Sequence, residues 1–247
     1  GIDFGQHDDG FDKTHCTLKP KVWWRVRFNQ SALPDQEVVD KEALERGKPY
    51  LDNLLAGDGK LKLNLGCFIN MFHHGWVNID GVDLKGFAEA HKFNFVQHDL
   101  RNPLPYNTGS VDLIFASHLL DAMTYREGLA LLRDCRRMLK PGGVIRISVP
   151  NLGLLAQRYY DDDGLDYFNE LSSSIRDEST DARKLWALIH KDHASLYDYP
   201  TLERMFEEVG FTYKEARFRE GEPQMQHETV DVLPCMTLYM EAEVVAD

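Results

Sequence analysis

The sequence has few cysteines, no long apolar run and no signal-peptide pattern at its start. Its four cysteines, Cys16, Cys67, Cys135 and Cys235, form no C-x-x-C pair, which argues against a disulfide framework. Cys67 and Cys135 lie in apolar patterns and are expected to be buried thiols. No stretch approaches the roughly 20 apolar residues that a membrane span needs. These absences predict a cytoplasmic protein without a membrane segment.

Basic residues are also fewer than acidic ones. The chain has 28 Lys and Arg against 40 Asp and Glu, a formal charge of −12. A nucleic-acid-binding protein usually presents a basic face, and the basic clusters here, such as 133–137, are short. Nucleic acid is therefore a disfavoured partner. A chain of 247 residues suits one large α/β domain or two small ones, and it can bury a stable core without disulfides or metal.

Short apolar runs alternate with helical patterns from residue 61 onward. Strands are predicted at 61–65, 76–80, 94–97, 111–116, 144–149, 211–218 and 236–244. Helices are predicted at about 125–139, at 151–160, and between the N-cap Asp198 and the terminating Gly210. The link between the first two strands leaves room for a brief helix or none. This order predicts a doubly wound α/β fold with a mostly parallel sheet.

Two segments lie outside this alternation. Residues 1–38 read as a partly irregular N-terminal arm, which either packs on the main domain or covers a substrate as a flap. The main domain is expected to span 39–247, with a helical insertion at about 151–197. The aromatic residues of the insertion suit a lid over an acceptor site, and at helical spacing they also suit a packed core.

The first predicted strand ends in a glycine turn at Gly66, and the second ends on Asp80. In doubly wound domains such a turn lets the backbone approach a nucleotide, and such an acid accepts ribose hydroxyls. The pattern is incomplete, because Phe68 and Met71 occupy the later glycine positions of a G-x-G-x-x-G motif. Alone, this stretch is a weak indication of a nucleotide site.

Several segments in order resemble the class I S-adenosylmethionine-dependent methyltransferases, and more narrowly their type 11-like group acting on small molecules and sugars. The segments are 63–67, 75–80, 98–105, 110–118 and 139–143. The resemblance covers about 60–245 and implies a Rossmann-like sheet with an antiparallel last strand. It also implies S-adenosylmethionine as cofactor and methyl transfer to an oxygen or nitrogen of a small-molecule acceptor, of glycosidic or aromatic type.

The resemblance assigns roles to residues at the strand ends. Gly66 and Asn64 would lie near the methionine part, Asp80 would accept both ribose hydroxyls, and Asp99 would accept the adenine amine. The full expected cofactor set is Asn64, Gly66, Cys67, Phe68, Asp80, His98, Asp99, Leu100 and Ser117. Asp80 and Asp99 also suit ordinary turns, and Cys67 suits a packing role. Asp112 is interpreted as a structural residue at a strand start.

His118 and His193 are the candidates for a general base, because histidine titrates near neutrality and both are expected at the carboxyl edge of the sheet. A packing or capping role fits each of them equally well. The family segment His-x-Leu-Glu-His is represented by 118–122, and Ala122 replaces its second histidine. No metal site is expected, because His190-x-x-His193 has no third ligand at suitable spacing.

Two alternatives to an active methyltransferase remain at this point. One is a non-catalytic or repurposed member that keeps the fold, since Phe68 and Ala122 depart from the family pattern. The other, an NAD-dependent oxidoreductase, would require the glycine triplet that the sequence lacks. The expected partner is a small-molecule acceptor, and the sequence leaves a homodimer open.

Overall fold

The computed structural model describes residues 59–73, 75–160, 193–216 and 237–244, with a few isolated positions between 180 and 189. The predictions for the N-terminal arm at 1–38, and for the insertion beyond residue 160 up to residue 192, fall almost entirely outside these residues. His190 is also outside them.

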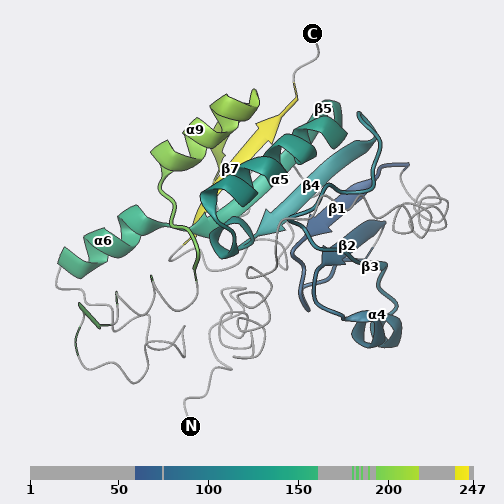
Figure 1. Ribbon diagram of the computed structural model, residues 1–247, viewed down its shortest axis with the longest axis horizontal. Helices are drawn as coiled ribbons and strands as arrows, with labels where there is room; N and C mark the ends of the chain where they lie inside the picture. Colours follow the sequence, from purple (N-terminus) through teal and green to yellow (C-terminus); the bar gives the residue numbers. More distant parts are fainter. Residues whose placement is uncertain are drawn as a thin grey trace, which may run out of the picture.

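The described strands form a seven-stranded sheet in the order β3-β2-β1-β4-β5-β7-β6. Figure 1 shows this order from β3 to β7. Their bounds are Lys62–Leu65 (β1), Trp76–Asp80 (β2), Phe95–Gln97 (β3), Val111–Ser117 (β4), Leu139–Pro150 (β5), Thr212–Ala216 (β6) and Thr237–Glu243 (β7). Strands β1 to β5 are parallel. The last strand, β7, lies antiparallel between β5 and β6. The predicted doubly wound sheet with an antiparallel last strand is confirmed.

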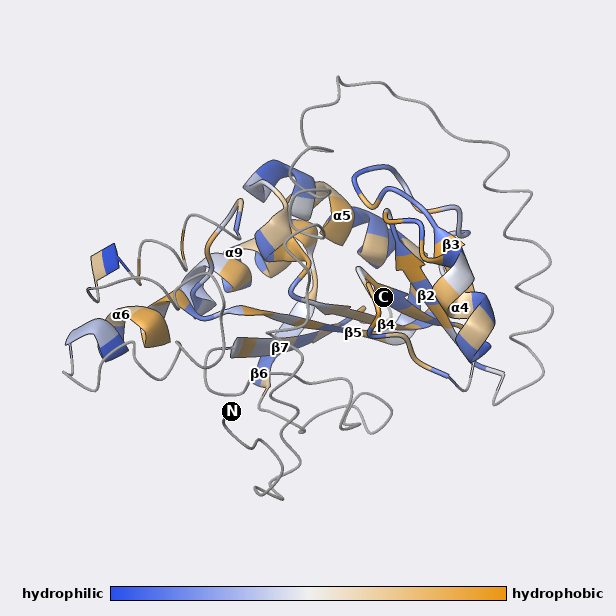
Figure 2. Cartoon of the chain, turned by 90° about the horizontal axis from the view of Figure 1, so that it is seen from below, coloured by the Kyte–Doolittle hydropathy of each residue, from blue (hydrophilic) through white to orange (hydrophobic). Residues whose placement is uncertain are grey.

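Helices α5 (Tyr125–Met138) and α9 (Tyr199–Val209) lie together on one face of the sheet, as Figure 2 shows. Their buried side chains, among them Leu132 and Phe206, join Leu63 and Ile114 of the sheet in one apolar core. The other described helices are α4 (Lys85–His91), the 3-10 turn η1 (Leu120–Ala122) and α6 (Leu152–Tyr160). None of the helices in the described part has the length and apolar character of a membrane span.

The ends of α5 and α9 follow from side chains that satisfy backbone groups. Thr124 and Glu127 form a reciprocal capping box at the start of α5. Asp198 accepts the N–H of Thr201 at 2.9 Å at the start of α9, and Gly210 ends that helix with φ +84°. The predicted start and end of α9 are therefore confirmed.

The link between β1 and β2 is held by a buried side-chain amide. The Asn78 Oδ1 accepts the N–H of Phe72 at 2.7 Å and the Nδ2 of Asn64 at 2.9 Å. The Asn78 Nδ2 donates to the carbonyls of Phe72 and Asn94 at 2.9 and 3.0 Å. The residues of the link that the structure describes form no helix, because these hydrogen bonds satisfy the backbone instead.

Asp112 joins neighbouring strands, as the sequence predicts for a structural residue. Its carboxylate accepts the N–H of Leu61 at 2.8 Å and pairs with the Nζ of Lys140 at 2.7 Å. Strand β5 begins at Leu139, earlier than the predicted residue 144, because Leu139 pairs with Val111 ahead of a register shift. The Pro-Gly-Gly segment thus ends α5 and also lies within the strand.

Candidate functional site

The candidate site lies at the carboxyl ends of the parallel strands, where β1 and β4 are neighbours. From this point the sheet continues to β2 and β3 on one side and to β5 on the other. Ligands of open α/β sheets bind in the crevice at such a switch point. Apart from Asn64, which lies inside β1, the predicted cofactor residues follow or end β1, β2, β3 or β4. The structure therefore places them along a single edge of the sheet.

The carboxylate of Asp80 fastens the turn after β1 to the end of β2. Asp80 is 1% exposed, and its Oδ2 accepts the N–H of Phe68 at 2.9 Å while its Oδ1 accepts the N–H of Val82 at 3.0 Å. The N–H groups of Gly66 and Cys67 both donate to the carbonyl of Ile79. These two backbone N–H groups fix the position of the Asp80 carboxylate. Asp80 is thus oriented as an acceptor beside the turn.

Phe68 adopts the backbone conformation of the glycine that it replaces. Its φ is +42°, and Gly66 has φ +68°. Residues with a side chain rarely enter this left-handed region, at a cost of about 1–2 kcal/mol. The Phe68 side chain is buried, while its N–H points to Asp80. The turn therefore keeps a glycine-like backbone path although the motif is incomplete in sequence.

Cys67 and Asn64 make structural contacts on either side of this turn. Cys67 is buried in a cluster with Met71, Ala88 and Phe95, which agrees with its packing interpretation. The Nδ2 of Asn64 donates to the carbonyl of Asn70 at 2.8 Å, in addition to its bond with Asn78. Both residues shape the turn, and their contact with a cofactor stays a prediction.

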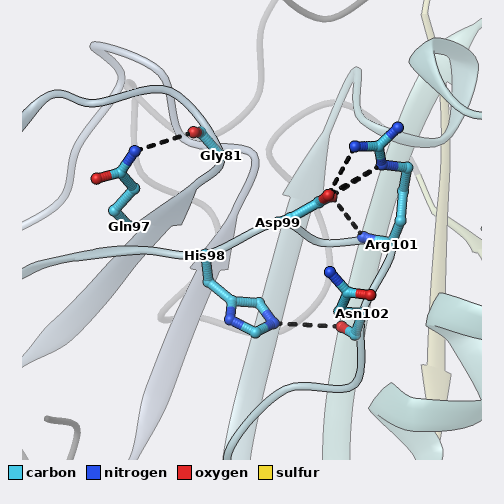
Figure 3. A network of polar contacts seen from close by, with 6 residues as sticks. All are labelled: Gly81, Gln97, His98, Asp99, Arg101 and Asn102. Carbon is cyan, nitrogen blue, oxygen red and sulfur yellow. Dashed lines mark hydrogen bonds and ion pairs between the residues drawn. The ribbon is translucent and has the colours of Figure 1, made fainter. Parts of the chain in front are cut away.

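The segment after β3 places Asp99 against Arg101 (Figure 3). The Arg101 Nη2 lies 2.6 Å from Asp99 Oδ2 and the Nε lies 2.9 Å from Oδ1. Burial raises the pKa of Asp99, but the hydrogen bonds and the positive charge of Arg101 outweigh it and hold the pKa below its usual value. Asp99 is therefore an ionised acceptor, and its side chain remains 38% exposed. Sequence reasoning missed Arg101, which the Asp-x-Arg spacing could have indicated.

The neighbours of Asp99 fix the path of the same loop. The His98 N–H donates to the carbonyl of Asp80 at 2.9 Å, and the His98 Nε2 lies 3.3 Å from the carbonyl oxygen of Asn102. Gln97 Nε2 donates to the carbonyl of Gly81 (Figure 3), at a distance of 3.4 Å. Leu100 is buried. The loops after β2 and β3 are thus joined directly.

Ser117 and His118 end β4 in a polar cluster. The Ser148 hydroxyl donates to the Ser117 hydroxyl at 2.8 Å. His118 has φ +48°, donates its N–H to the carbonyl of Ser148 at 2.8 Å, and places Nε2 3.1 Å from the Thr237 hydroxyl. These contacts link His118 to β5 and β7 at the carboxyl edge, where the sequence predicts it.

His193 is brought to a carboxylate that sequence reasoning missed. Its Nδ1 lies 2.9 Å from Oδ2 of Asp121 in η1, and the Asp121 side chain is fully buried. The two residues are 72 positions apart in the sequence. The one available signal was a carboxylate inside the otherwise apolar run 119–123, just beyond the fourth predicted strand.

The fold and this edge together define a doubly wound α/β domain with a candidate site at its switch point. A family model described as a methyltransferase domain matches residues 55–216, more than half of the chain. The chain therefore belongs to this family of methyltransferase domains. The comparison with curated proteins gave no match.

The chain is similar to several solved structures at low sequence identity. One is a methyltransferase in complex with the Trm112 methyltransferase activator of Haloferax volcanii, with 13% identity, a TM-score of 0.50, and coverage of 92% of this chain and 96% of that chain. A SAM-dependent methyltransferase from Archaeoglobus fulgidus has 17% identity, a TM-score of 0.48, and coverage of 82% and 93%. A complex of DhpI with SAH has 15% identity, a TM-score of 0.47, and coverage of 92% and 96%.

Proposed function

We propose that the protein transfers a methyl group from S-adenosylmethionine to an oxygen or nitrogen of a small-molecule acceptor. The observation that carries this proposal is the Asp80 carboxylate, buried at the end of β2 and bonded to the N–H of Phe68. An acid in this position beside a glycine-type turn suits the ribose of a nucleoside cofactor. The methyltransferase family of the chain narrows that cofactor to S-adenosylmethionine.

The described residues fit this cofactor along its length. The turn 66–68 would accommodate the methionine part, since the positive φ of Gly66 and Phe68 brings backbone close to the ligand. Asp80 would accept the ribose hydroxyls, and the ionised Asp99 would accept the adenine amine. When bound, S-adenosylmethionine supplies a methyl group activated by a sulfonium. The protein would supply binding and orientation.

The same proposal covers the cellular compartment of the protein and the class of its acceptor. Cys67 and Cys135 are buried in apolar clusters, and we place the protein in a reducing compartment such as the cytoplasm. We place the acceptor among the small molecules, glycosidic or aromatic, of the type 11-like group that the sequence resembles. A repurposed member of the family would bind the cofactor without transferring the methyl group. Screening small molecules for a mass increase of one methyl separates these two functions.

Calorimetric titration with S-adenosylmethionine tests the cofactor assignment. We expect saturable binding to the wild-type chain and a loss of about 10- to 100-fold in affinity for Asp80→Asn, because an amide cannot accept from both hydroxyls as a carboxylate does. Asp83→Asn is the matched control, since Asp83 is exposed and accepts only a local N–H of Lys85 in the described part. Equal binding by Asp80→Asn, or binding of NAD in place of S-adenosylmethionine, would overturn the assignment.

A further inference from the structure

Asp121 fixes the state of the His193 ring. An ionised carboxylate only accepts hydrogen bonds, so beside an ionised Asp121 the Nδ1 of His193, 2.9 Å from Oδ2, is the nitrogen that carries the hydrogen. In the neutral ring the lone pair then lies on Nε2. The pair is almost dry, with side-chain exposures of 8% for His193 and 0% for Asp121. A buried carboxylate that orients an imidazole in this way is the arrangement of a general base.

The segment that carries His193 is held firmly on η1. The N–H groups of Ala194 and Ser195 donate to the carbonyl of Asp121 at 2.7 and 3.1 Å. The Ser195 hydroxyl donates to the carbonyl of Met123 at 2.8 Å, and the Tyr197 hydroxyl lies 3.3 Å from the carbonyl of Leu120. Because η1 follows the carboxyl end of β4, the pair lies at the same switch point as the turn after β1.

Two other groups, Tyr197 and His118, are less suited than His193 to take a proton from the acceptor. Burial raises the pKa of Tyr197, and the charge of Asp121 raises it further, so Tyr197 stays a neutral hydrogen-bond donor at neutral pH. The hydroxyl of Thr237 beside His118 can donate or accept. That contact is compatible with either tautomer of His118, whereas the carboxylate of Asp121 selects one tautomer of His193.

We propose that His193 is the general base of the methyl transfer, that Asp121 positions it, and that the acceptor atom is a hydroxyl oxygen. The inference rests on the proposed function. As the hydroxyl oxygen attacks the methyl carbon, an oxygen–carbon bond forms and the carbon–sulfur bond breaks, with its electron pair passing to sulfur. The hydroxyl proton moves to Nε2 of His193 and later to solvent, and Asp121 stabilises the imidazolium. A neutral amine would attack through its own lone pair and would not need this pair of residues.

The tautomer of His193 provides a test that needs neither cofactor nor acceptor. Nitrogen-15 NMR of the imidazoles in the full chain should show His193 in the Nδ1–H form in the wild type. Asp121→Asn should shift it toward the Nε2–H form. Ser195→Ala is the matched control, because it removes a hydrogen bond of the same segment and leaves the pair intact. An Nε2–H tautomer in the wild type, or the same tautomer in Asp121→Asn, would overturn the positioning role.

Turnover tests the base and the acceptor class together. The probes are hydroxyl and amine compounds of matched skeleton: phenol with aniline, and a methyl glycoside with its amino analogue. We expect methylation of the hydroxyl member, and a fall of about 100- to 10,000-fold in kcat for His193→Gln with the affinity for S-adenosylmethionine unchanged. The acidic limb of the wild-type pH profile should disappear in His193→Gln.

Other outcomes separate the failure of this inference from that of the proposed function. Methylation of the amine members alone, or a wild-type kcat in His193→Gln, would refute the hydroxyl mechanism while leaving the methyltransferase assignment standing. Absence of S-adenosylmethionine binding by the wild type would instead refute the proposed function. If Asp121→Asn does not fold, the wild-type tautomer and His193→Gln still decide the question.

Discussion

Phe68 holds a backbone conformation that only glycine adopts without strain, and its buried ring compensates for that strain. Replacing it separates the two effects. Phe68→Ala removes the ring and keeps a Cβ at φ +42°, which should destabilise the protein by about 3–5 kcal/mol. Phe68→Gly removes the same ring but also the strain, so it should be about 1 kcal/mol more stable than Phe68→Ala. Urea denaturation of both variants measures the difference.

The informative result is which of these two variants is the more stable. At ordinary positions glycine is less stable than alanine by about 0.5–1 kcal/mol. If Phe68→Ala proved the more stable of the two, the left-handed turn would be contradicted.

The contact between Asp99 and Arg101 leads to a prediction about the pKa of Asp99 and the pH dependence of stability. The hydrogen bonds and charge of Arg101 hold the pKa of Asp99 below its usual value against the opposing effect of burial. We therefore expect this pKa to rise in Arg101→Gln, as carbon-13 NMR of the Asp99 carboxyl would measure. Because the folded-state pKa is lowered, the pair stabilises the fold above the unfolded-state pKa, and this stabilisation is lost as pH falls through the folded value. An unchanged pKa in the variant would exclude Arg101 as the cause.

At the scale of elements, the capping box of α5 is the clearest local determinant of where a helix begins. The Glu127 carboxylate accepts the Thr124 N–H at 2.8 Å and the Thr124 hydroxyl at 2.7 Å. Thr124→Ala should therefore lower the free energy of unfolding by about 1 kcal/mol, measured by thermal or chemical denaturation. Arg126→Ala, on the exposed first turn of the same helix, should change it by less than about 0.5 kcal/mol. Equal effects of both changes would contradict the capping role.

Local signals decide which elements the sequence reveals. Asp198 and Gly210 mark both ends of α9, and the apolar periodicity between them defines its buried face, so this helix was predictable. Helix α4 has only seven residues and no side-chain hydrogen bond at its N-cap, so its sequence carries little signal. The start of β5 was predicted wrongly, because its Pro-Gly-Gly segment reads as a helix end while pairing with β4 is a tertiary effect.

In the candidate site, too, local sequence patterns reveal some features and tertiary contacts determine others. Asp80 and Gly66 could be placed because each directly follows or ends a predicted strand. The contact of His193 with Asp121 could not be predicted, since the residues are 72 positions apart and meet only when the segment before α9 packs on η1. Likewise, the glycine-like φ of Phe68 is enforced by the hydrogen bond to Asp80, which no local pattern specifies.

At the scale of the whole molecule, a buried ion pair joins the parallel and antiparallel parts of the sheet. The Arg146 Nη1 of β5 lies 2.9 Å from the Glu241 Oε1 of β7, with side-chain exposures of 0% and 3%. Lys214 Nζ lies 3.5 Å from the other oxygen of Glu241. The guanidinium of Arg146 also lies 5.3 Å from the ring centroid of Tyr239. This network fixes the register of β7 between its neighbours.

Removing one member of the pair should cost more than removing both. Glu241→Leu removes the carboxylate opposite the buried Arg146 and should destabilise the fold by about 3–5 kcal/mol. Arg146→Met leaves Glu241 beside Lys214 and should cost less. The double variant Arg146→Met with Glu241→Leu should recover at least half of the summed loss. Equilibrium unfolding in urea of the three variants measures the coupling, and strictly additive losses would contradict it.

The central claim is that the edge formed by the ends of β1 and β2 binds the nucleoside of S-adenosylmethionine. A crystal structure of the full chain with S-adenosylhomocysteine tests it most directly. We predict that the ribose hydroxyls lie within hydrogen-bond distance of the Asp80 carboxylate, beside the N–H of Phe68. A structure in which the ligand is absent at saturating concentration, or in which its ribose lies away from Asp80, would contradict the claim.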